Sequence, residues 1–243
     1  MFRIVGICRQ SQHSSWIEGS CSPIEEAARV RTTSEVIDEL ASDLRPVAEG
    51  AVARTIALGV GGGLLFSAAM MLAWLGVRPD FAAAMTTGLF WVKFAYTLLL
   101  VAAGLSSVGR LARPAGQAQA ASVAVIVLVA GIAILAGGQL AMAPHAERDH
   151  LILGATAETC PWNIMILSLP IFLGTVWALR RLAPTRLTIA GLAAGLGSGA
   201  AGAWIYSFHC DESAIPFVAV WYTLGIVLMS LCGAISGRYL LRW

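Results

Sequence analysis

The chain has 243 residues, of which 58% are hydrophobic and only 12% are charged. Because soluble domains carry about 25% charged residues, this composition excludes an ordinary water-soluble protein and predicts an integral membrane protein. The net charge of +2 excludes no further class of protein. Membrane topology depends on how charges are distributed along the chain, and the net charge does not determine it.

Residues 1–31 show no helical or strand periodicity. We expect them to be disordered or a mis-assigned N-terminal extension, with Val30 as a hypothetical alternative start. Nothing near Met1 has the apolar run of a signal peptide, so the N-terminal region is expected to stay on the side of the membrane where it is made.

Residues 32–47 predict a short amphipathic helix within a cytoplasmic segment, 32–54. Thr32 and Glu35 have the spacing of a capping box, and Arg45-Pro46 ends the helix because the residue before proline avoids helical geometry. An acidic face is repelled by anionic lipid, so we predict a protein partner with a basic groove, with a solvated helix near the membrane as the alternative. The apolar residues are Val36, Ile37, Leu40, Leu44 and Val47, and the acidic ones are Glu35, Asp38, Glu39 and Asp43.

Six apolar runs follow, and about 20 apolar residues suffice to span a bilayer. The expected fold is therefore an all-α membrane protein, with a six-helix transmembrane domain over residues 55–243 and the short amphipathic helix before it. The predicted spans are Thr55–Val77, Phe81–Val108, Ala120–Ala143, Trp162–Leu179, Leu187–Phe208 and Phe217–Gly237, and a polar loop is expected over Pro144–Pro161.

The arginines are distributed unequally between the two ends of these spans. Six spans put both termini on one side, and from residue 45 onward nine arginines fall on that side against two on the other. The positive-inside rule then places both termini in the cytoplasm. The nine are Arg45, Arg54, Arg110, Arg113, Arg180, Arg181, Arg186, Arg238 and Arg242; the two are Arg78 and Arg148.

Two features inside the spans point to packing or function. Gly191, Gly195 and Gly199 recur every four residues with Ser198 and Gly202 beside them, which indicates close helix packing, with a pore or ligand groove as the alternative. Lys93 is the only lysine and is expected near the middle of the second span, facing the bundle interior, a water-filled cavity or a carbonyl cluster.

Cys160 and Cys210 are expected on the outer side at similar depth. In an oxidising compartment such a pair forms disulfides, so a structural disulfide and a reversible redox pair are both open. Unpaired thiols and metal ligation with His145, His150 or His209 are further alternatives, although no tight ligand spacing supports a metal. His209 could favour the Cys210 thiolate when protonated. Cys232 is expected to pack inside the sixth span, and Cys8 and Cys21 to be cytoplasmic and reduced.

No nucleophile–base–acid set, phosphate loop or cofactor motif is present. We therefore predict no enzyme activity, no cofactor, no metal and no direct contact with nucleic acid. The rival hypotheses are a small-molecule transporter or redox-active membrane protein using Lys93, and a membrane scaffold without switching.

Short motifs in a fixed order make residues 32–243 resemble the NrsF family of multi-pass membrane anti-sigma factors. Their positions on the six-span map make the combination specific, although each motif alone is short. They are Ser34–Leu40, Asp43–Val47, Arg78-Pro79-Asp80, Lys93, Cys160-Pro161-Trp162, Leu182-Ala183-Pro184, His209–Glu212, Trp221-Tyr222 and Gly237–Trp243.

The resemblance implies a regulator in the bacterial inner membrane that holds an extracytoplasmic-function sigma factor. It implies that oxidants or thiol-reactive metals act on Cys160 and Cys210 in the periplasm and release the sigma factor. A helix-in-groove contact would use Val36, Ile37, Asp38, Glu39, Leu40, Asp43, Leu44 and Arg45. The expected partners are the sigma factor and the lipid bilayer, with homo-oligomerisation possible.

Overall fold

The structure is a computed structural model that describes residues 32–42, 50–113, 116 and 119–242. These residues fall into two units, one within Met1–Val47 and one within Ala48–Trp243. The predicted extension 1–31 and the end of the predicted amphipathic helix lie outside the described residues.

The first unit contributes one helix, α2, over Thr33–Ser42. The predicted capping box is present: the Thr32 amide donates to the Glu35 carboxylate at 2.8 Å, and the Glu35 amide donates to the Thr32 hydroxyl at 3.4 Å. These two bonds satisfy amides that the first turn of a helix leaves unpaired. Every described residue of α2 is exposed.

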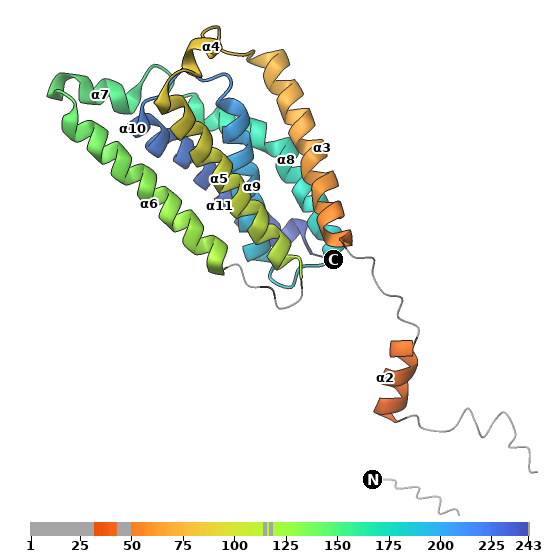
Figure 1. Cartoon of the computed structure of the whole chain (residues 1–243). Coiled ribbons are helices and arrows are strands. Elements are labelled where there is room, and N and C mark those ends of the chain that lie inside the picture. Colours follow the sequence, from red (N-terminus) through yellow and green to blue (C-terminus); the bar gives the residue numbers. More distant parts are fainter. Residues whose placement is uncertain (1–31, 43–49, 114–115, 117–118, 243) are drawn as a thin grey trace, which may run out of the picture. The chain divides into compact units, whose positions relative to one another are not determined.

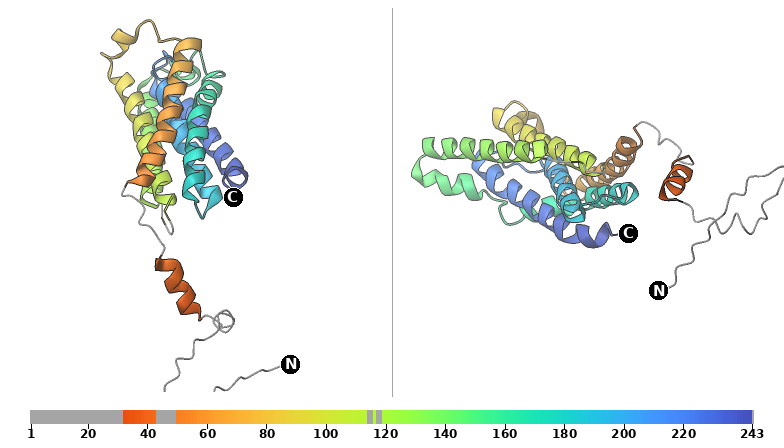
Figure 2. Two further views of the ribbon diagram at one scale, coloured as in Figure 1. Left: turned by 90° about the vertical axis from the view of Figure 1, so that its right-hand side faces the viewer. Right: turned by 90° about the horizontal axis from the view of Figure 1, so that it is seen from below.

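The second unit is a bundle of helices (Figures 1 and 2). Among the described residues, six segments are long and apolar enough to cross a membrane, which confirms the predicted all-α fold with six spans. They are α3 (Ala51–Trp74), α5 (Gly88–Leu111), α6 (Gln119–Met142), α8 (Cys160–Leu182), α9 (Leu187–Tyr206), and the continuous run of α10 (Ile215–Phe217), a π-helical turn (Val218–Tyr222) and α11 (Thr223–Leu240).

The two ends of the bundle differ in what they carry. One end, here called the terminal face, holds the start of α3 and the end of α11 (Figure 1). The other, here called the cysteine face, holds the connections that follow α3, α6 and α9. These connections contain α4 (Phe81–Ala84) and α7 (His145–Leu153). Neither short helix was predicted: Phe81–Ala84 was expected within a span and His145–Leu153 within a loop.

Helix α9 is the most buried span, because its small residues let neighbouring backbones approach. A Cβ on Gly191 would lie 2.2 Å from the Gly233 carbonyl oxygen of α11, and one on Gly202 would lie 2.2 Å from the Ser168 hydroxyl of α8. The structure therefore confirms the packing interpretation of the small-residue stripe. Helices α3 and α8 make a similar contact through Gly59 and Gly174.

Candidate functional site

The two cysteines lie together at the cysteine face. Cys160 is the first residue of α8 and is followed by Pro161. Proline suits the first turn of a helix because N–H groups there have no partner within the helix, so its lack of an N–H costs no hydrogen bond. Cys210 lies just beyond α9, in the loop 207–214. The side chain of Cys160 lies within hydrogen-bonding reach of the Cys210 sulfur. Both are free thiols in this structure, and both residues are buried, at 0% and 2% exposure.

The backbone around Cys210 is held by two cations. Lys93 donates to the carbonyl oxygens of Cys210 at 2.9 Å and Glu212 at 2.8 Å. Arg78 donates to the same Cys210 oxygen at 3.2 Å, while its guanidinium also makes a two-bond contact with Asp80. Charged donors make stronger hydrogen bonds than neutral ones, so these bonds hold the Cys210 carbonyl, and the loop around it, in place.

The predicted position of Lys93 was wrong, although its expected carbonyl partners are present. The second span begins at Gly88, because the chain breaks after α4 and restarts there. Lys93 consequently lies in the second turn of α5, at the cysteine face, and is 1% exposed. A buried ammonium needs compensation for lost hydration, and the two carbonyls supply it.

The surroundings of the Cys210 sulfur favour its thiolate. The Cys160 thiol hydrogen-bonds this sulfur and the Lys93 ammonium attracts it, and these effects outweigh burial to hold the pKa of Cys210 below its usual value. The Tyr222 hydroxyl is buried without an oxygen or nitrogen partner among the described residues and lies beside the same sulfur. The π-helical turn that ends at Tyr222 brings this side chain into the site.

His209 does not supply the cation that the sequence analysis considered for Cys210. Its Nδ1 lies 3.0 Å from the Gly76 carbonyl oxygen, just beyond α3. Lys93, from a different helix, takes that electrostatic role. The contact of His209 instead adds another link between the loop 207–214 and the end of α3.

The loop also contacts the other connections of the cysteine face. The Glu212 carboxylate accepts a hydrogen bond from the Ala155 amide at 2.7 Å. Gly154, with φ at +54°, leaves the space that this carboxylate occupies. The Gln139 side chain accepts from the Ile215 amide at 3.0 Å. Movement of the loop would therefore be felt by α3, α5, α6 and the connection between α7 and α8.

The remaining histidine and cysteine predictions have separate outcomes. Within the described residues, no group of three or more His, Cys, Asp or Glu side chains lies close enough together to hold a metal ion. Cys232 was expected to pack inside the sixth span, but it is exposed, so it faces outward from the bundle. Cys8 and Cys21 lie outside the described residues.

The predicted partner-binding residues divide between described and undescribed segments. Val36, Ile37 and Leu40 lie on α2 and are 38%, 57% and 67% exposed. Asp38 and Glu39 are exposed on the same helix. Asp43, Leu44 and Arg45 lie outside the described residues, so the structure gives no account of them.

The sequence did not predict that Arg78 and Tyr222 belong to the cysteine site. Arg78 was counted among the arginines on the outer side and was noted within the motif Arg78-Pro79-Asp80. Tyr222 was noted only within the motif Trp221-Tyr222. Arg78 lies 132 residues from Cys210 along the chain, so proximity in sequence could not reveal it. Tyr222 follows Cys210 by only a few helical turns, and an intramembrane tyrosine next to a tryptophan was a weak signal for it.

A six-span helical bundle with a paired-thiol site at one end defines the chain as a multi-pass membrane protein. The family described as NrsF, negative regulator of sigma F, matches residues 40–243, and the chain belongs to this family. It is 38% identical over 212 residues to the anti-sigma-F factor NrsF of Caulobacter vibrioides, covering 87% of this chain and 99% of the relative. It is 36% identical over 211 residues to the probable anti-sigma-F factor NrsF of Azospira oryzae, with the same coverage. No solved structure matches.

Proposed function

We propose that this chain is a membrane anti-sigma factor that holds an extracytoplasmic-function sigma factor and releases it when Cys160 and Cys210 are oxidised or bind a thiol-reactive metal. Membership of the NrsF family supports the regulatory role, and so do the names of its relatives. The observation that carries the sensing role is the buried contact between the two thiols. The proposed role is regulatory, without catalysis.

Helix α2 supplies the proposed sigma-binding surface. Its exposed Val36, Ile37 and Leu40 lie within one turn and have no apolar neighbour to cover them among the described residues. An amphipathic helix with such an apolar stripe suits a groove on a partner. Its carboxylates favour a basic partner surface through charge complementarity.

The proposed topology puts the terminal face in the cytoplasm of the bacterial inner membrane. Arginines of the described residues gather at that face, including Arg54, Arg110 and Arg186, whereas Arg78 and Arg148 are at the cysteine face. The positive-inside rule supports this orientation. It would put the cysteine face in the periplasm, where thiols can be oxidised.

The proposed chemistry starts at Cys210. Its thiolate attacks a hydroperoxide, the O–O bond breaks, and a sulfenic acid forms; the departing alkoxide or hydroxide takes up the proton that the thiol released and leaves as alcohol or water. The Cys160 sulfur then attacks the Cys210 sulfur, and hydroxide leaves with the Cys160 proton as water. The two thiols thus lose two electrons to the peroxide and become a disulfide. A soft metal ion would instead bridge the two sulfurs as thiolates.

Disulfide formation would move the loop 207–214. Two sulfurs in hydrogen-bond contact must approach to about 2.05 Å to bond. The Cys210 carbonyl is held by Arg78 and Lys93, so the approach would pull on the end of α3 and on α5. Because α3 is the span that directly follows the sigma-binding segment in the chain, it is the proposed route of the signal.

The test is co-purification of the sigma factor with the membrane-embedded chain, before and after treatment with hydrogen peroxide. We expect peroxide to release the sigma factor from the wild type and dithiothreitol to restore binding. Cys160→Ser and Cys210→Ser should each abolish this response, whereas Cys232→Ser, an exposed cysteine outside the site, should keep it. A normal response from both site variants would refute redox sensing by this pair.

A second test separates sigma binding from sensing. Leu40→Asp replaces an apolar side chain worth about 2 kcal/mol of burial, so we expect the affinity for the sigma factor to fall at least roughly thirtyfold. Ser42→Asp is the matched control, because it adds the same charge to the opposite side of α2. Equal binding by Leu40→Asp and wild type would show that α2 is not the contact surface.

A further inference from the structure

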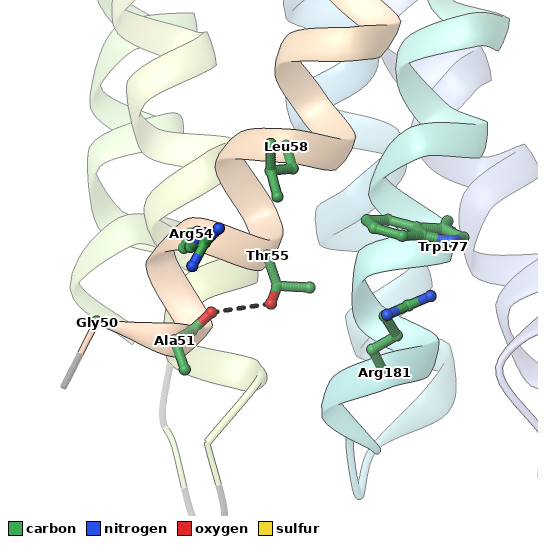
Figure 3. A pocket seen from close by; sticks show the side chains of 7 residues that line it. All are labelled: Gly50, Ala51, Arg54, Thr55, Leu58, Trp177 and Arg181. Carbon is green, nitrogen blue, oxygen red and sulfur yellow. Dashed lines mark hydrogen bonds between the residues drawn. The ribbon is translucent and has the colours of Figure 1, made fainter. Parts of the chain in front are cut away.

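A pocket opens at the terminal face between the start of α3 and the end of α8 (Figure 3). Its volume is about 420 Å³. Arg54, Thr55 and Leu58 line it from α3, together with the backbone at Gly50 and Ala51, and Trp177 and Arg181 line it from α8. This pocket lies at the far end of the bundle from the cysteine site.

The pocket lies beside the contact between α3 and α8. At the level of Gly59 and Gly174 the two backbones are in contact, with no side chain between them. Closer to the terminal face, α8 carries the large side chains of Trp177, about one turn beyond Gly174, and Arg181, about two turns beyond it. Trp177 and Leu58 are both exposed, so the opening faces outward from the bundle.

The pocket carries positive charge that no carboxylate of the described residues offsets. Neither Arg54 nor Arg181 forms an ion pair with a carboxylate of the described residues, and the Arg181 guanidinium stacks on Trp177 at 4.5 Å. Gly50 gives the first turn of α3 no side-chain cap, so its amides and the positive end of the helix dipole add to the field. Arginine guanidinium groups bind phosphate through paired hydrogen bonds.

An apolar path leads from the pocket along the outer surface of the same two helices. Leu58 and Leu65 lie seven residues apart on one face of α3 and are 60% and 76% exposed. Leu173, one turn before Trp177 on α8, is 61% exposed. Tryptophan is typical of the boundary between headgroups and acyl chains, so a cationic pocket continues directly into a lipid-facing surface.

We propose that this pocket binds the phosphate of an anionic phospholipid, with Arg54 and Arg181 on the headgroup and the acyl chains along Leu58 and Leu173. Basic pockets between transmembrane helices are a known mode of binding anionic headgroups. The continuity of charge with an apolar surface selects a lipid over a soluble phosphate ester, which would leave the apolar part unused. This inference does not depend on the sigma factor or on the cysteines.

The experiment is native mass spectrometry of the full chain in detergent, titrated with cardiolipin, phosphatidylglycerol or phosphatidylcholine. We expect the anionic lipids to bind at least tenfold more tightly than phosphatidylcholine. The double variant Arg54→Gln/Arg181→Gln should lose this preference. The matched control Arg186→Gln/Arg238→Gln removes the same charge from the same face outside the pocket and should bind within about twofold of wild type.

Three results would overturn the proposal. Equal loss in both double variants would assign the effect to general charge at the terminal face. Equal binding of phosphatidylcholine would remove the role of the phosphate charge. Displacement of bound lipid by millimolar inorganic phosphate as effectively as by phosphatidylglycerol would identify the ligand as a soluble phosphate. A circular-dichroism spectrum and melting midpoint equal to those of wild type establish that the pocket variant is folded.

Discussion

Replacing Lys93 by Met tests whether this buried cation sets the reactivity of Cys210. Methionine keeps an unbranched chain of similar size but removes the charge and the bonds to the Cys210 and Glu212 carbonyls. A nearby opposite charge shifts a pKa by about 1–3 units. We therefore expect the pKa of Cys210 to rise by at least about one unit, equivalent to about 1.4 kcal/mol.

The assay is the rate of Cys210 oxidation by hydrogen peroxide, followed by peptide mass spectrometry between pH 5 and 9. The wild-type rate should reach half its maximum below the ordinary thiol pKa of about 8.5, and the midpoint of Lys93→Met should lie higher. Lys93→Arg should retain a low midpoint. Arg148→Gln, which removes a cation from α7 at the same face, should not change it. An unchanged midpoint in a folded Lys93→Met protein would refute the electrostatic role of Lys93.

Two further predictions concern stability, read as the melting midpoint in detergent. Gly191→Ala puts a Cβ 2.2 Å from the Gly233 carbonyl oxygen and should destabilise the bundle by about 1–3 kcal/mol. Gly131→Ala is the control, because Gly131 has open space around it, and it should not destabilise the bundle. Equal melting midpoints for the two variants would contradict the close α9–α11 contact. The folded-state pKa of Cys210 is lowered, so between that pKa and about 8.5 the unfolded chain binds more protons than the folded chain. The stability of the protein should therefore rise with pH in this window. The same stability should be lost as the pH falls through the folded-state pKa. Cys210→Ser should flatten this rise, and an equally steep rise in that variant would assign it to another group.

Composition and periodicity were sufficient to predict the six spans, because each apolar run is long enough to cross a bilayer and is bounded by polar or proline-containing segments. They were not sufficient at Phe81–Thr87, where an apolar segment next to a span forms a short separate helix. That error moved Lys93 to mid-membrane and hid its contact with Cys210. The local signal for this break is short, because the only polar residues between the two apolar helices are Thr86 and Thr87, with Thr87 at the N-cap position of α5.

The site itself was predictable only in part. Matching distances of Cys160 and Cys210 from the ends of their apolar runs indicated similar depth, and the structure brings their thiols together. Two partners of the pair come from distant parts of the chain, Arg78 from just beyond α3 and Lys93 from α5, while Tyr222 comes from the nearby π-helical turn. Such long-range contacts depend on how the helices pack, which a single sequence does not specify.

The arrangement of the helices suggests why the cysteine pair suits a switch. Helices α3 and α8 are joined by close backbone contact at Gly59 and by the hydrogen bond from Ser67 to the Leu167 carbonyl at 2.7 Å. Helices α9 and α11 are joined through their glycines. Cys160 belongs to the first pair, and Cys210 belongs to the loop that connects the second.

A disulfide would therefore be a covalent link between two packed pairs of helices. Each pair is held by backbone contact, and α8 also contacts α9 closely at Gly202, so we expect the α3–α8 pair to shift about that contact. At the cysteine face, the α3–α8 pair carries Cys160 on α8. Arg78, just beyond the end of α3, lies at the same face and contacts the Cys210 carbonyl. The terminal face of the same pair carries the Arg54–Arg181 pocket and begins directly after the segment proposed to bind the sigma factor. If the pair moves as one body, a lipid in that pocket would resist the shift that oxidation drives, so removal of anionic lipid should lower the peroxide dose that releases the sigma factor.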